Sequence, residues 1–329
     1  MIVGEGQYRY EVQDTWEQLP DGWSHGDVAG IATDSQDRVY VFNRTEHPVI
    51  VYDRDGTYLD SWGDATLYPR PHGITIVDDI IYLVDDGDHT VRKTTLDGTI
   101  LMTLGTSGQP SDSGYVANRP NNLSTITHGA GPFNRPTRVS VAQNGELYVA
   151  DGYGNARIHR YSADGTLLQS WGEPGTGPGE FNLPHSVWAH TDGRVFICDR
   201  ENDRVQIFGP TGDLLTTWTN VTRPGDMFIL PDGNVVLGEM DWVQGTPYLW
   251  GGTMAEDRPA RVTIRDIEGN VLAGWGGPDR CAAGSFVSPH GLWVDSQGSI
   301  YVGEVTRTSL SRFGGGPADC HTVQKFVRI

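Results

Sequence analysis

The chain has 329 residues, among them 43 glycines and 19 prolines, a combined share well above the roughly 12% of average proteins. This composition excludes helix bundles and coiled coils, while 37% hydrophobic residues and 10 tryptophans exclude a disordered chain. The formal net charge of −18 argues against nucleic acid and anionic membrane surfaces as partners.

One sequence pattern recurs six times along the chain. Each copy has a β-type run that often begins with proline, then a run ending in Asp or Glu, a third run, and a final run that often ends in Trp-Gly. The copies span residues 28–63, 70–105, 135–172 and 183–218, and the last two begin at Arg223 and Ser288. Repeats of this kind indicate that one supersecondary unit is stacked several times.

Each copy predicts one antiparallel sheet of four strands, because its alternating runs are separated by two-residue turns that contain glycine. A lone sheet of this size cannot bury both faces, and radial stacking protects the sheet edges. The sequence therefore predicts an all-β fold, a six-bladed β-propeller that forms a single domain over residues 1–329.

The two ends of the chain are expected to meet in the last blade. The sixth copy ends at Ile329 without its fourth strand, and residues 8–18 near the start have the pattern of that strand. We therefore predict that the N-terminal strand closes the last blade. Two insertions rich in Gly, Pro and Asn, at residues 106–132 and about 242–260, are expected between blades, as lids or rims over the ring.

Three histidines fall on equivalent positions of alternate copies. The first strand of each blade lines the central channel, so these positions share one height: Ala29, His72, Thr137, His185, Gly225 and His290. Alternate blades of a six-bladed ring are 120° apart, which lets three imidazoles point at one axis. Three protein ligands with an open fourth position are typical of catalytic zinc. Ordinary polar residues at a wet channel mouth are the alternative interpretation.

The Pro-His pairs at 71–72, 184–185 and 289–290, together with the repeat itself, resemble the NHL-type propellers of the peptidyl-α-hydroxyglycine α-amidating lyase family. The resemblance covers nearly the whole chain and is strongest over residues 133–208. It implies zinc held by His72, His185 and His290. It also implies Tyr153 as catalytic base, with Arg200 and Arg44 as catalytic residues that hold the substrate.

Elementary chemistry agrees with these roles. Tyr153, Arg200 and Arg44 each lie at the end of a second strand or in the turn after it, close to the predicted channel mouth. A tyrosine acts as a base when nearby cations lower its pKa from about 10, and arginines bind carboxylates through two parallel hydrogen bonds.

The chain departs from the family pattern at several positions. Calcium is doubtful, because Gly291 replaces the carboxylate ligand that the resemblance implies beside the carbonyls of Ile31 and Ile74. Arg138 and Ser288 also differ from the family, and we expect both to contact the substrate.

The three cysteines, Cys198, Cys281 and Cys320, show no paired spacing, so neither a disulfide framework nor a cysteine zinc site is expected. No apolar stretch approaches the roughly 20 residues of a membrane span, and residues 1–13 lack a signal-peptide pattern. A cytoplasmic protein is expected.

These observations lead to a metal-dependent lyase that cleaves a small carbinolamide or a related α-hydroxy acid derivative. Its expected partner is a small molecule bearing a carboxylate, with no nucleic acid and no membrane. A zinc-dependent hydrolase or hydratase at the same site is an alternative. A non-catalytic platform that binds proteins is another, although it leaves the alternate-blade histidines unexplained.

Overall fold

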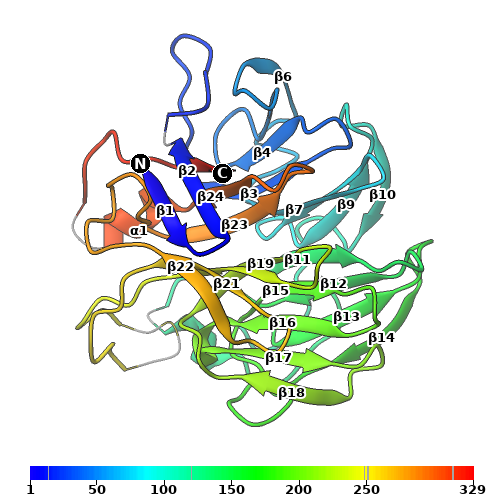
Figure 1. The fold of residues 1–329 in the computed structure, drawn as a ribbon. Helices are drawn as coiled ribbons and strands as arrows, with labels where there is room; N and C mark the ends of the chain where they lie inside the picture. The colour runs from blue at the N-terminus through cyan, green and yellow to red at the C-terminus, as the bar shows by residue number, and fades with distance from the viewer. Residues whose placement is uncertain (14, 120, 248, 250–251, 313–314) are drawn as a thin grey trace.

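The computed structural model describes residues 1–329 except 14, 120, 248, 250–251 and 313–314. Its strands form six antiparallel sheets, five with four strands and one with five. The sheets are arranged around a common axis, and the two termini lie close together on one of them (Figure 1). The six-bladed, all-β prediction is confirmed.

The blades follow one another in chain order, each with its first strand innermost. Blade one contains β3 (Val28–Thr33), β4 (Val39–Asn43), β5 (Val49–Tyr52) and β6 (Tyr58–Trp62). Blade two contains β7 (Pro71–Val77), β8 (Ile80–Asp85), β9 (Thr90–Thr94) and β10 (Ile100–Leu104). Blade three contains β11 (Pro136–Val141), β12 (Leu147–Asp151), β13 (Arg157–Tyr161) and β14 (Leu167–Trp171).

The second half repeats this order. Blade four contains β15 (Pro184–Ala189), β16 (Val195–Asp199), β17 (Arg204–Phe208) and β18 (Leu214–Trp218). Blade five contains β19 (Pro224–Ile229), β20 (Val235–Glu239), β21 (Arg261–Arg265) and β22 (Val271–Trp275). Blade six contains β23 (Pro289–Val294), β24 (Ile300–Glu304), β25 (Val323–Arg328), β2 (Tyr8–Gln13) and β1 (Ile2–Glu5).

The ring closes as the sequence predicts. In blade six, β2 pairs antiparallel with β25, with Val12 opposite Phe326, and β1 adds a fifth strand outside it. Each first strand contacts the first strand of the next blade, and β23 contacts β3 to complete the circle. The N-terminal strand therefore joins the two ends of the chain through sheet hydrogen bonds.

The hydrophobic core is divided among the gaps between blades. Between blades two and three, for example, Val84 packs with Val139 and Val149. The second strands are buried at every residue in β4, β12, β16, β20 and β24. The fourth strands are largely exposed, as in β10. Burial thus decreases outward along each blade.

The outer hairpins are longer than the two-residue turns that we expected. In blade one, Gly56 N donates to Asp53 O at 3.1 Å, and Asp53 N donates to Thr57 O at 2.9 Å. Gly56 has a φ of 90°, in the left-handed region. This is a type I turn followed by a glycine bulge, a geometry that also fits the right-handed twist of the strands.

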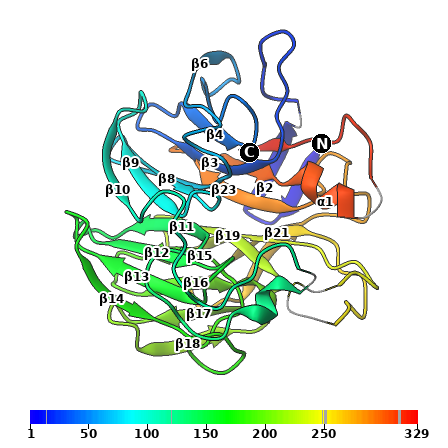
Figure 2. The same cartoon turned by 180° about the vertical axis from the view of Figure 1, so that it is seen from behind.

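One of the two predicted insertions lies elsewhere than expected. Residues 106–132 connect blades two and three and contain the short helix η1 (Asn122–Thr125). Residues 242–260 do not separate blades, because they lie between β20 and β21 inside blade five. A third insertion, unpredicted, joins β24 to β25 and carries α1 (Thr306–Arg312). Figure 2 shows α1 and η1 at the same side of the ring.

The expectation for the cysteines is wrong. Cys281 and Cys320 form a disulfide with 5.0 Å between their Cα atoms, while Cys198 is a free and buried thiol. The bond ties the third insertion to the segment that precedes β23. Disulfides are rare in the cytosol, so this bond weighs against the cytoplasmic location expected from the sequence.

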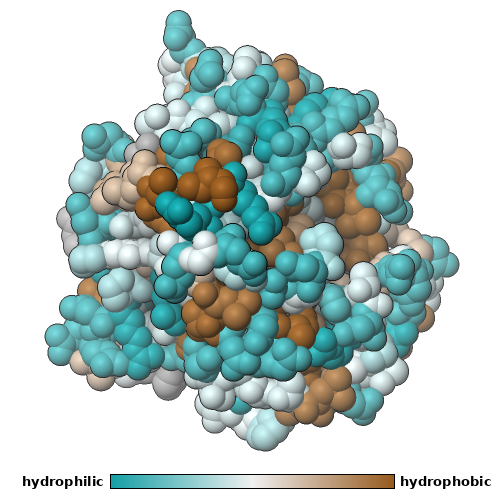
Figure 3. Space-filling model, viewed as in Figure 1, coloured by the Kyte–Doolittle hydropathy of each residue, from teal (hydrophilic) through white to brown (hydrophobic). Residues whose placement is uncertain are grey.

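The surface is mainly hydrophilic on the face of Figure 1, with separate hydrophobic patches between polar regions (Figure 3). Within the described residues, no helix combines the length and the apolar character that crossing a membrane requires.

We predict that the denatured, unreduced protein exposes one thiol and that reduction exposes three. Replacing Cys281 and Cys320 by serine should lower the free energy of unfolding by about 2–4 kcal/mol, because the bond closes a long loop in the unfolded chain. Thiol titration and chemical denaturation measure the two effects. Three titratable thiols without reductant would contradict the disulfide.

Candidate metal centre

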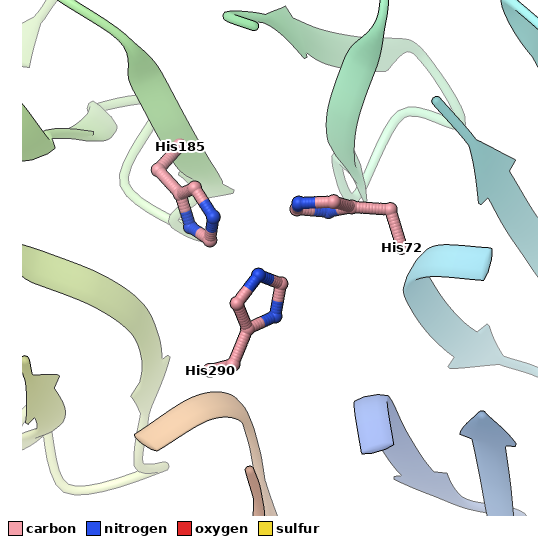
Figure 4. A group of neighbouring side chains, drawn as sticks. All are labelled: His72, His185 and His290. Atoms are coloured by element: carbon pink, nitrogen blue, oxygen red, sulfur yellow. The ribbon is translucent and has the colours of Figure 1, made fainter. Parts of the chain in front are cut away.

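The three histidines occupy the second position of alternate first strands. His72 lies in β7, His185 in β15 and His290 in β23, each directly after the proline that begins the strand. All three are buried, with 2–4% of each residue exposed. Their rings converge from three blades on one point of the channel (Figure 4), with centroids 4.5–4.9 Å apart.

Each imidazole is oriented by a backbone carbonyl of the following blade. The Nδ1 atom lies 2.6 Å from Thr137 O for His72, 2.7 Å from Gly225 O for His185 and 2.7 Å from Ala29 O for His290. A carbonyl can only accept, so each Nδ1 carries the proton and each Nε2 presents a lone pair. Hydrogen bonds of this kind set the tautomer of metal-binding histidines.

The Nε2 atoms have the properties of a metal site. One ligand nitrogen from each ring lies within 4.8 Å of the others. The Nε2 atoms of His72 and His290 are buried and have no hydrogen-bond partner. A buried polar atom without a partner is costly, and a divalent ion at the centre of the three rings would satisfy all of them. The residues present therefore fit a metal ion.

Electrostatics keep the imidazoles neutral. Burial holds the pKa of His72 well below 6.5, reinforced by His290 and Arg44. The same cause, burial first, holds the pKa values of His185 and His290 well below 6.5. Neutral imidazole is the form that binds metals.

A small cavity of about 60 Å³ lies beside His290, and the predicted base and arginines line it. Tyr153, Arg200, Arg44 and Ser288 are all part of its wall. The structure thus brings together four of the five residues that the sequence placed near the substrate. Three further arginines in the wall, Arg70, Arg223 and Arg312, were not predicted.

Tyr153 lies between the histidines and the arginines. Its Oη atom is 3.3 Å from His185 Nε2 and accepts a hydrogen bond of 3.1 Å from Arg200 Nη1. Burial raises the pKa of Tyr153, but Arg200, Arg70 and Arg44 outweigh it, so that the net pKa is below 10. These cations stabilise the ionised form of the phenol relative to a free tyrosine.

Arg200 is held in place by an acidic neighbour. Its Nε donates to Glu201 Oε1 at 2.8 Å, and Arg223 Nη2 donates to the same oxygen at 2.9 Å. Burial opposes ionisation of Glu201, but Arg223 and Arg200 outweigh it and lower its pKa to about 2. Glu201 therefore remains a carboxylate that fixes two guanidinium groups at the cavity.

Arg44 keeps part of its hydrogen-bonding capacity for a ligand. Its Nε donates to Pro71 O at 3.1 Å, and its Nη1 lies 3.3 Å from Asp27 Oδ2. The Nη2 atom is buried and has no hydrogen-bond partner. A ligand oxygen in the cavity would satisfy this donor, which is the property expected of a carboxylate-binding arginine.

Arg138 does not line the cavity, contrary to the expectation that it contacts the substrate. Its guanidinium group is buried in the channel, where Nη1 donates to Ile74 O at 2.7 Å and Nη2 lies 3.4 Å from Asp226 Oδ2. A cation of the chain itself thus binds the carbonyl that the family resemblance assigned to calcium. Gly291 leaves no room for a carboxylate there, because a Cβ atom would lie 2.7 Å from Gly30 Cα.

The missed arginines carry a sequence signal that was not used. Arg70 and Arg223 each stand directly before the proline that begins a first strand, as Arg135 does in blade three. Arg70 and Arg223 line the cavity from this position, so an arginine directly before that proline is a sequence signal for a cationic site. Arg312 carries no such signal, because α1 lies outside the repeat.

The NHL repeat profile matches residues 133–161 and 181–208, the inner three strands of blades three and four. NHL repeat-containing protein 3 of Mus musculus is 31% identical over 331 residues, which cover 92% of this chain and 86% of that protein. The chain belongs to the NHL-repeat family that this protein represents.

The chain also resembles the amidating lyases. The probable peptidyl-alpha-hydroxyglycine alpha-amidating lyase of Caenorhabditis elegans is 31% identical over 218 residues, or 61% of this chain and 56% of that protein. The crystal structure of virginiamycin B lyase from Staphylococcus aureus has the same fold, with a TM-score of 0.59 at 15% identity, covering 97% of this chain and 100% of that one.

We predict that the protein binds one equivalent of a divalent metal and that His185→Ala abolishes stoichiometric binding with the fold retained. The matched control is His128→Ala, since His128 is exposed and lies in the first insertion. Elemental analysis after purification without chelators measures the metal, and circular dichroism measures the fold. Full metal content in His185→Ala would exclude this centre.

Arg138 and Asp226 form a buried ion pair. The side chains of Arg138 and Asp226 are only 4% and 3% exposed, so Asp226→Asn leaves a buried charge without its partner. This should lower the free energy of unfolding by about 3–5 kcal/mol. The double variant Arg138→Met with Asp226→Asn should lose less than the sum of the two single variants. Additive losses in denaturant titrations would show that the pair does not interact.

Proposed function

We propose that the chain is a zinc-dependent lyase that cleaves a small carbinolamide, or a related α-hydroxy acid derivative, bearing a carboxylate. The observation that carries this proposal is a cluster of three imidazoles, one of which, His290, lines a small cavity together with Tyr153 and a set of arginines. The named lyase relative supports the reaction class. Zinc suits three imidazole ligands with an open position, and when bound it supplies Lewis-acid polarisation of a substrate oxygen.

The arginines of the cavity bind and orient the substrate carboxylate. The Nη2 atom of Arg44, which has no hydrogen-bond partner in the protein, donates to one carboxylate oxygen. Arg200, which Glu201 holds in place, lines the same cavity. Charge-assisted hydrogen bonds of this kind are shorter and stronger than neutral ones. They place the hydroxyl-bearing carbon beside the Tyr153 phenol.

Tyr153 moves the proton. As a phenolate, it takes the proton of the substrate hydroxyl, and the O–H electron pair becomes the second bond of a new carbonyl group. The C–N bond breaks at the same carbon, and its electron pair stays on the amide nitrogen, which receives the proton from Tyr153. The products are a primary amide and a 2-oxo acid such as glyoxylate, so atoms and charges balance without an added water molecule.

Two alternative functions are consistent with the fold. A hydrolase or hydratase would activate a water molecule in the cavity, because metal-bound water has a pKa near 7. A platform for protein partners would bind them on the faces of the ring and catalyse no reaction. NHL repeat-containing protein 3, whose name states no enzymatic activity, supports this alternative. A metal-free wild-type protein would support the platform.

We predict that Tyr153→Phe lowers turnover of an N-acyl-α-hydroxyglycine by about 10²–10⁴-fold, the usual contribution of general acid–base catalysis. Tyr58→Phe, in the outer strand β6, is the matched control and should be fully active. Glyoxylate and amide formation are followed by chromatography, against a sample without enzyme. Undiminished turnover in Tyr153→Phe would remove the proposed base.

Turnover in ¹⁸O-labelled water separates the lyase from an amide hydrolase. The lyase releases an unlabelled primary amide, whereas hydrolysis of the acyl–nitrogen bond releases a carboxylic acid with one solvent oxygen. The acyl product is the informative one, because aldehyde oxygens exchange with water. A labelled acid would overturn the lyase assignment.

A further inference from the structure

Part of the cavity wall in the candidate active site is helical. Residues 305, 308, 309 and 312, which belong to α1 or directly precede it, all line the cavity. This spacing places the four side chains on one face of a helix. They are Val305, Thr308, Ser309 and Arg312. The same spacing places Leu310 on the opposite face, and Leu310 is buried.

Leu310 packs against the disulfide. It forms an apolar cluster with Val287 and Cys320, against which the partly buried Cys281 also packs. The Cys281–Cys320 bond thus supports α1 from behind. The helix lies between this bond on one side and the cavity on the other, so a change at the bond can reach the cavity through α1 alone.

Few other contacts hold α1 against the ring. Among the residues of α1, only Thr306 and Leu310 are buried. Thr308 N donates to Asp27 Oδ1 at 3.0 Å, and residues 315–319, farther along the same insertion, are exposed. Segments with few buried apolar contacts open at a low free energy. The disulfide therefore contributes a large part of what keeps α1 in place.

The position of α1 is connected to that of the proposed substrate-binding arginine. Asp27 accepts hydrogen bonds from both the backbone and the side chain of Thr308. The Oδ2 atom of the same carboxylate lies 3.3 Å from Arg44 Nη1. Asp27 thus fixes α1 and Arg44 relative to one another. Movement of α1 would remove Arg312 from the wall and leave Arg44 less well oriented.

The disulfide can be reached by a reductant. Cys281 is partly exposed, whereas Cys320 is only 3% exposed. The thiolate of a dithiol can attack the Cys281 sulfur and release Cys320, and the second thiol then releases Cys281 as the dithiol closes its own disulfide. Two electrons and two protons pass from the dithiol to the chain. Cys198 takes no part, because it is buried in β16.

We propose that the Cys281–Cys320 bond is a redox-sensitive switch that controls the wall of the candidate active site. While the bond is formed, α1 stays docked on Asp27 and the cavity is complete. After reduction by a dithiol, α1 opens more often and the cavity loses Arg312. The proposal rests on the proposed lyase function only for its effect on turnover, because the opening of α1 can be measured separately.

Hydrogen–deuterium exchange of the zinc-loaded protein measures this opening. Ser309 N donates to Val305 O at 3.0 Å and Thr308 N donates to Asp27, so both amides exchange when α1 opens. Exchange in peptides that cover residues 305–312 should become at least about tenfold faster after reduction, since disulfides commonly stabilise by more than this factor. Unchanged exchange in these peptides would overturn the proposal.

The outer strand β14 (Leu167–Trp171) provides the internal control. It lies in blade three, across the ring from the disulfide, and its first two residues are exposed, so it opens locally. Its exchange should not change on reduction. Equal acceleration in β14 and in α1 would overturn the proposal, because the bond would then stabilise the fold as a whole.

A double variant tests whether the dithiol acts through this bond. Cys281→Ser with Cys320→Ser should show the fast exchange in α1 without any reductant. The matched control is the same variant treated with the dithiol, which can bind zinc in both proteins but should change nothing further in α1. A dithiol effect as large as in the wild type would overturn the proposal. Re-oxidation of the reduced wild-type protein should restore slow exchange.

Turnover of an N-acyl-α-hydroxyglycine distinguishes this proposal from the lyase function. The kcat/KM value should fall at least about tenfold on reduction and recover on re-oxidation, because small displacements of orienting groups are costly. Faster exchange in α1 with no turnover in either redox form would support the opening of α1 and contradict the lyase. Equal turnover in both forms would support the lyase and contradict control of the site by the disulfide.

Discussion

The hydrogen bonds from three histidines to the carbonyls of neighbouring blades are the constraint on which the site depends. The first strand of each blade is a sheet edge, and in a closed ring its carbonyls face the next blade instead of a further strand. His72, His185 and His290 use these carbonyls, so that ring closure itself fixes the three tautomers. An open ring would lose the acceptor of His290, which belongs to blade one.

The parts that follow the repeat were predictable, and the reason is geometric. Equivalent residues of a ring share one height and direction, so the spacing of the three Pro-His pairs placed the imidazoles without any knowledge of contacts. The closing strand at residues 8–13 followed from the same count. The outer turns differ from the prediction because Asp and Gly are shared by two-residue turns and by type I turns with a bulge, and local sequence does not separate them.

The segments outside the repeat could not be predicted in this way. The insertion at 242–260, the helix α1 and the Cys281–Cys320 bond have no equivalent in other blades, so their positions depend on tertiary contacts. The position of the Arg138 side chain could not be predicted either, although Arg138 lies within the repeat. Arg138 follows the channel position Thr137 at a register irregularity of β11, and its guanidinium group lies against Asp226 rather than in the cavity wall.

The overall charge of the chain is a poor guide to its site. A protein with a net charge of −18 surrounds a cavity with five arginines and one aspartate, Asp241. Some of these arginines are paired by carboxylates behind them, as Glu201 pairs Arg200 and Arg223. That pairing makes the burial of so many cations tolerable, yet Arg44 keeps a buried donor without a partner. A divalent ion held by the three histidines would add further positive charge beside these arginines, so the charge balance of the cavity favours an anionic ligand.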